Sequence, residues 1–88
     1  KNPESSIPRE DAFVYIIRMA NLERVAKLEN IYKVEYADGN MLSEGRTGYC
    51  AILSGLGVIN GDGGYIRPQD NLTRAETVVM LYRYLLNV

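Results

Sequence analysis

Residues 57–76, GVINGDGGYIRPQDNLTRAE, decide the fold of this chain. The glycines permit positive φ, and Asp62 favours a turn, so the first half is typical of a structured loop. Thr73 and Glu76 have the spacing of a capping box, in which each side chain accepts a hydrogen bond from the other residue's amide. The stretch therefore predicts a loop that leads directly into a helix. Its apolar face comprises Ala75, Val78, Val79, Leu81, Tyr82, Leu85 and Leu86.

Two further helices are predicted upstream of this loop. Apolar residues recur at three- and four-residue steps after Pro8, which predicts a helix over about 8–20 that can extend to 28. A second helix is expected from Ser43 or the next residue to Leu56, with Ser43 as its N-cap. We interpret residues 29–42 as an extended connector with room for one very short strand. We expect Tyr65 and Ile66 to anchor the glycine loop on the core.

These elements predict an all-α fold of three helices joined by two structured loops that contain glycine and proline. We divide the chain into the second half of a preceding repeat (1–28), a connector (29–42) and a helix–loop–helix unit (43–88). A chain of 88 residues is one small domain or a piece of a larger protein. It lacks an initial methionine and a signal-peptide core, so we expect a mature or excised fragment.

The composition excludes several classes of function. A net charge of −1 without histidine argues against nucleic-acid binding, and no apolar run is long enough for membrane insertion. Cys50 has no partner for a disulfide or a metal cluster, and we expect it to be a small core residue. The 60–71 loop lacks the glycine and the acid that an EF-hand requires at its sixth and twelfth positions. Without a nucleophile motif or metal ligands we expect no enzyme activity and no cofactor.

The two ends of the chain show an internal repeat at an offset of 65 residues. Ile7 aligns with Leu72 at the two helix starts, and Asp11 aligns with Glu76. Apolar positions would match between any two amphipathic helices. Two aligned arginine pairs are more informative: Arg9 with Arg74, and Arg18 with Arg83.

At this point the chain resembles the S-layer homology domain. The similarity covers residues 36–86 and rests on the entry Tyr36-Ala37-Asp38, the loop from Gly57 to Pro68, and the signature Leu72-Thr73-Arg74-Ala75-Glu76. Residues 7–22 then resemble the closing helix of a preceding repeat. The resemblance implies a module of the bacterial cell surface or cell wall that binds wall polysaccharide and packs against neighbouring repeats. It also implies an acidic ligand, commonly a pyruvylated amino sugar held between repeats.

The resemblance indicates Arg74 as the main contact to a sugar carboxylate. The first turn of a helix favours anions, and a guanidinium can add a bidentate contact. We include the loop residues Asn60, Gly61 and Asp62 because nests of amides bind anions, and we add Arg9 and Asp38 with less weight. The structural alternative is that Arg74 only pairs with nearby acids.

Two departures from the family pattern favour a second reading of the function. The first repeat begins Pro8-Arg9-Glu10-Asp11, without the capping threonine, and Gly45 and Arg46 replace a common tryptophan. The alternative function is therefore a structural or protein-interaction module with a degenerate glycan site. An incomplete repeat also exposes an apolar helix face, which predicts self-association.

Overall fold

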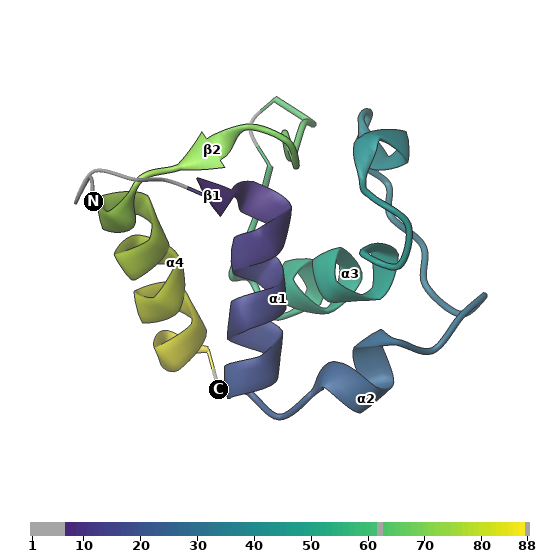
Figure 1. Ribbon diagram of the computed structural model, residues 1–88, viewed down its shortest axis with the longest axis horizontal. Coiled ribbons are helices and arrows are strands. Elements are labelled where there is room, and N and C mark those ends of the chain that lie inside the picture. The colour runs from purple at the N-terminus through teal and green to yellow at the C-terminus, as the bar shows by residue number, and fades with distance from the viewer. Residues whose placement is uncertain (1–6, 62, 88) are drawn as a thin grey trace.

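The protein is mostly helical, with a small sheet that the sequence did not predict. The computed structural model describes residues 7–61 and 63–87. The elements in chain order are β1 (Ile7–Pro8), α1 (Arg9–Met19), α2 (Glu23–Ala26), the 3-10 helix η1 (Gly39–Met41), α3 (Thr47–Gly55), β2 (Asn71–Leu72) and α4 (Arg74–Leu86) (Figure 1). The expected all-α, three-helix description therefore needs correction: there are four α-helices and one pair of strands in the described residues.

The two strands join the starts of α1 and α4. They pair antiparallel, with Ile7 opposite Leu72, which are the two residues that the internal repeat aligns. Pro8 precedes α1 as its N-cap residue instead of being its first helical residue. The amide of Arg9 donates to the carbonyl of Asp70 (2.8 Å), and the amide of Glu10 donates to that of Pro68 (3.1 Å). The backbone before β2 thus satisfies helix-start amides that a capping side chain would otherwise serve.

Helix α1 does not continue to residue 28, because a local backbone motif ends it. Asn21 has φ of 61°, a left-handed conformation that asparagine tolerates better than most residues. The amide of Leu22 donates to the carbonyl of Ile17, and that of Asn21 to Arg18, both at 3.0 Å. This is the Schellman pattern, and it makes α2 a separate short helix. The same pattern ends α3, where Gly57 takes the left-handed position.

The connector and the start of α3 differ from the prediction. Burial alternates from Ile31 to Tyr36, but within residues 29–42, all of which the structure describes, no strand forms. Alternation needs only one buried face, whereas a strand also needs a free neighbouring edge. Helix α3 begins at Thr47 after Arg46, so Ser43 is not its N-cap. The Ser43 side chain instead donates to the carboxylate of Glu10 on α1.

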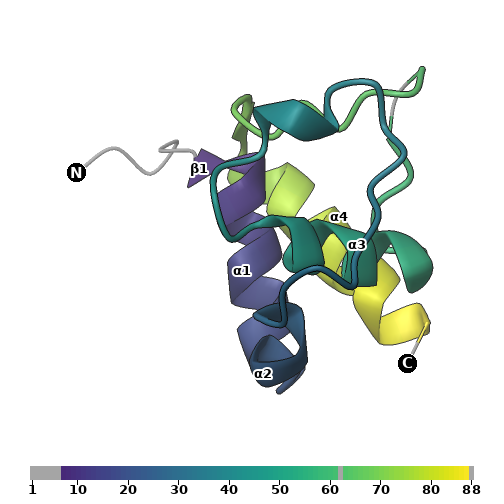
Figure 2. The same cartoon turned by 90° about the vertical axis from the view of Figure 1, so that its right-hand side faces the viewer.

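The core forms where α1 packs on α2, α3 and α4. Figure 1 shows α4 and α3 flanking α1, and Figure 2 shows α2 at the far end of α1 from β1. The largest fully buried side chains include Phe13 and Ile17 from α1, Leu53 from α3, and Ile66 and Leu72 from the second half of the chain. Cys50 is also fully buried, as expected. Among the described residues no helix is long and apolar enough to cross a membrane.

Helix α3 approaches α2 so closely that only glycine fits at the contact. A Cβ atom at Gly48 would lie 2.0 Å from the carbonyl oxygen of Ala26 and 2.8 Å from Cε2 of Tyr32. The backbone of α3 therefore rests directly on the end of α2. Glycine lowers helix propensity, so this contact must be held by tertiary packing.

Candidate functional site

A half-open groove of about 340 Å³ lies between the start of α1, the 58–61 segment and α4. One stripe of α4 forms a wall, because Glu76, Val79, Met80 and Arg83 follow the i, i+3, i+4, i+7 spacing of a single helix face. The remaining lining residues are Arg9, Val58, Ile59, Asn60, Gly61 and Leu72. The groove therefore joins the helix start of the first repeat to the loop and the closing helix of the second.

Arg9 enters this groove in a fixed position. Its Nε donates to the carbonyl oxygen of Ile66 at 2.7 Å, and the bond is partly buried. The backbone pairing of β1 with β2 fixes the Arg9 main chain as well. This anchoring uses one of the five guanidinium donors, which makes Arg9 a preorganised cation.

The loop side of the groove carries two of the residues that the sequence indicated, Asn60 and Gly61. Asn60 is exposed, and Gly61 is half-buried with φ of 75°. A Cβ atom at Gly61 would lie 2.6 Å from Cε1 of Tyr36, whose hydroxyl is 2.7 Å from Oγ of Ser54. Gly61 thus lets the loop close on a tyrosine that α3 holds in place.

The start of α4 has the predicted capping box. The amide of Glu76 donates to Oγ1 of Thr73 (3.2 Å), and the amide of Thr73 donates to Oε1 of Glu76 (2.8 Å). The hydrogen bond from the Thr73 amide, aided by nearby Arg9 and Arg67, holds the pKa of the Glu76 carboxyl below its usual value. Glu76 therefore remains ionised beside Arg9 at neutral pH.

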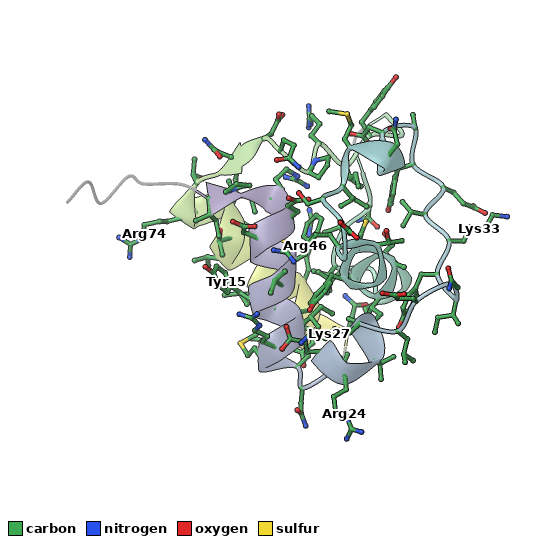
Figure 3. The ribbon with its side chains drawn as sticks, turned by 45° about the vertical axis from the view of Figure 1, so that its right-hand side comes forward. Tyr15, Arg24, Lys27, Lys33, Arg46 and Arg74 are labelled. Carbon is green, nitrogen blue, oxygen red and sulfur yellow. The ribbon has the colours of Figure 1, made fainter. Side chains whose placement is uncertain are left out.

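Arg74 and Asp38, two other predicted contacts, do not line the groove. Arg74 does not line it, and Figure 3 shows its side chain extending away from the body of the protein. The carboxylate of Asp38 accepts hydrogen bonds from the amides of Ile66 (3.0 Å) and Arg67 (2.8 Å), so it holds the returning loop. Asp62 lies outside the described residues.

The anchor residue of the loop also differs from the expectation. Ile66 is buried as predicted, but half of the Tyr65 surface is exposed. Two hydrogen bonds hold the backbone of Ile66 in place. Its amide donates to the carboxylate of Asp38, and its carbonyl accepts from Nε of Arg9. The apolar anchor is therefore Ile66.

Arg83 is a lining residue that the sequence did not indicate as a contact. The internal repeat did align it with Arg18, but that match was used only to support the repeat. Its position in the groove follows from the side of α1 on which α4 packs. Two arginines and one glutamate give the groove a formal charge of +1, which suits an anionic group. In the part of the chain that the structure describes, no group of three or more metal-binding side chains occurs.

Glu10 explains why the first repeat departs from the signature. It occupies the position of Ala75 in the second copy, and it is buried. Its carboxylate accepts hydrogen bonds from the amide and the hydroxyl of Ser43. Burial raises the pKa of this carboxyl, but the bonds from Ser43 prevail, so its pKa lies below the ordinary value. Glu10 thus ties the segment before α3 to α1.

Comparison with known proteins relates part of this chain to a protein family. Residues 43–78 match the family model of the S-layer homology domain. Such domains are non-catalytic modules of secreted cell-surface proteins, where they typically serve as cell-wall anchors. The chain is similar to an amylopullulanase of Thermoanaerobacterium thermosulfurigenes, with 30% identity over 84 residues. That match covers 94% of this chain but 4% of the relative. No solved structure gives a significant match.

Proposed function

We propose that this chain is a non-catalytic module that binds an acidic polysaccharide of the bacterial cell wall and thereby tethers a larger secreted protein. The observation that carries the proposal is the groove in which Arg9 from one repeat meets Asn60 and Gly61 from the next. Arg9 supplies a fixed cation, and the loop supplies polar groups at the rim. This combination suits the carboxylate of a pyruvylated amino sugar, since a guanidinium can hold a carboxylate in bidentate geometry.

In this proposal Arg74 belongs to a second, equivalent position. The internal repeat places Arg74 where Arg9 stands in the first copy. Residues 58–61 form one side of the groove that contains Arg9. Arg74 would need a further copy of that loop beside it to form the same groove. We accordingly expect Arg74 to contribute less than Arg9 when this chain binds alone, and more when another repeat adjoins it.

Sedimentation with purified wall sacculi tests the proposal. The parent chain is compared with Arg9→Gln, Arg74→Ala and the control Arg24→Gln, which removes an exposed charge on α2. We expect the parent and the control to sediment with the walls, Arg9→Gln to remain in solution, and Arg74→Ala to be weakened. Circular dichroism verifies that each variant is folded. If the parent stays in solution, or if folded Arg9→Gln sediments like the parent, the assignment of this groove is wrong.

A second candidate function, association with another repeat, is favoured by the exposed face of α4. Val78, Tyr82 and Leu85 are each more than 60% exposed, although Phe13 and Ile17, the repeat equivalents of the first two, are fully buried on α1. A helix that exposes this much apolar surface is suited to a protein partner. We expect the isolated chain to self-associate through α4. Light scattering that shows only monomer at high protein concentration would contradict this.

A further inference from the structure

Arg83 lines the groove with an exposed side chain whose charge is not paired within the described residues. It lies on the stripe of α4 that lines the groove, and its side chain is exposed. Within residues 7–61 and 63–87 its guanidinium forms no hydrogen bond or ion pair, whereas its backbone carbonyl accepts a hydrogen bond from the side-chain amide of Asn87 (2.8 Å). Its guanidinium is therefore available to a ligand in the groove.

The internal repeat provides a comparison for this arginine. Arg18 occupies the same position in the first copy, and its Nε donates to the carboxylate of Glu23, five residues later, at 2.8 Å. The residue five positions after Arg83 is Val88, whose side chain has no carboxylate. The second copy thus keeps the arginine but not its acidic partner.

We infer that Arg83 is a second anion-contacting residue of this groove, and that one acidic sugar ligand contacts both Arg9 and Arg83. The inference rests on the proposed glycan binding and adds a residue to it. Glu76 lies beside Arg9 at the start of the stripe and Arg83 at its end, two helical turns or about 10 Å further along. Both arginines line this one groove, so a single acidic ligand in it can contact both.

The test uses purified wall glycan in two forms, intact and with its carboxyl groups chemically reduced to alcohols. Affinities of the parent chain, Arg83→Gln, Arg83→Lys and Arg24→Gln are measured by calorimetry. Arg24→Gln is the matched control, because it removes one exposed positive charge outside the groove, where the Arg24 side chain extends from α2 into solvent (Figure 3). Circular dichroism verifies the fold, and Arg83→Lys retains the charge if the glutamine variant is poorly folded.

We expect Arg83→Gln to bind intact glycan about tenfold more weakly than the parent, as for the loss of one charge-assisted hydrogen bond. Arg83→Lys should lie between them, and Arg24→Gln should match the parent. With reduced glycan, the parent and Arg83→Gln should bind equally. If the parent binds but folded Arg83→Gln binds as well, the inference fails and the proposed function stands. An equal loss on reduced glycan would show contact with neutral groups and overturn the anion assignment. If the parent binds neither form, both proposals fail.

Discussion

Replacement of Gly48 by alanine tests how α3 is held against α2. A Cβ atom at this position would lie 2.0 Å from the carbonyl oxygen of Ala26 and 2.8 Å from the ring of Tyr32. The first of these atoms belongs to the backbone at the end of α2, so a side-chain rotation cannot relieve the overlap. We expect α3 to shift away from α2, which loosens the contact that closes this end of the core.

The magnitude follows from two opposing effects. Overpacking in a well-packed interior costs about 1–3 kcal/mol, and a collision with backbone belongs at or above the upper end. Alanine in place of glycine within a helix stabilises the helix by up to about 1 kcal/mol, because alanine has the higher helix propensity. The net loss is about 2 kcal/mol of unfolding free energy. For a domain of this size, that lowers the melting temperature by roughly 8–16 °C.

Thermal unfolding followed by circular dichroism measures the effect, and Gly55→Ala is the matched control. Gly55 is the last residue of the same helix, and a Cβ atom there would meet nothing within 4 Å. We expect this control to leave the melting temperature unchanged or to raise it by a few degrees, since it gains propensity without a collision. If Gly48→Ala melts at or above the temperature of the parent, the close approach of α3 to α2 is wrong.

Three further predictions concern the tie to α1, the capping box and the buried thiol. Glu10→Gln should lose about 2 kcal/mol at neutral pH, because hydrogen bonds to a charged carboxylate are the stronger kind. The folded-state pKa of Glu10 is lowered, so this stabilisation is present above the ordinary carboxyl pKa of 4.5 and is lost as the pH falls through the folded-state pKa. The melting temperatures of parent and variant should therefore converge in acid. A difference in melting temperature that does not change with pH would contradict the assignment. Thr73→Ala should cost about 1 kcal/mol in urea unfolding, whereas Thr73→Ser should restore most of it. Burial raises the pKa of the Cys50 thiol to about 11, so a thiol reagent at pH 8 should label it slowly in native protein and quickly in denaturant; rapid native labelling would refute its burial.

The candidate site could be predicted only in part. Residues 57–76 indicated the loop residues Asn60 and Gly61, because glycine turns and the family signature are local patterns. The relative positions of Arg9 and Arg74 were not predictable in this way. Each arginine is the first residue of its helix, so the local sequence does not distinguish them. Only the packing of α4 beside α1 places Arg9 in a groove and Arg74 outside it.

The sequence alone determined the features that depend on neighbouring residues. The capping box fixes the start of α4, because Thr73 and Glu76 satisfy each other's amides without help from the rest of the chain. Tertiary structure decided the features that depend on distant partners. The start of α1 has no such pair, and its amides are satisfied by carbonyl groups at Pro68 and Asp70, about sixty residues away. The same long-range pairing brings the two repeats together, so the groove between them exists only in the folded protein.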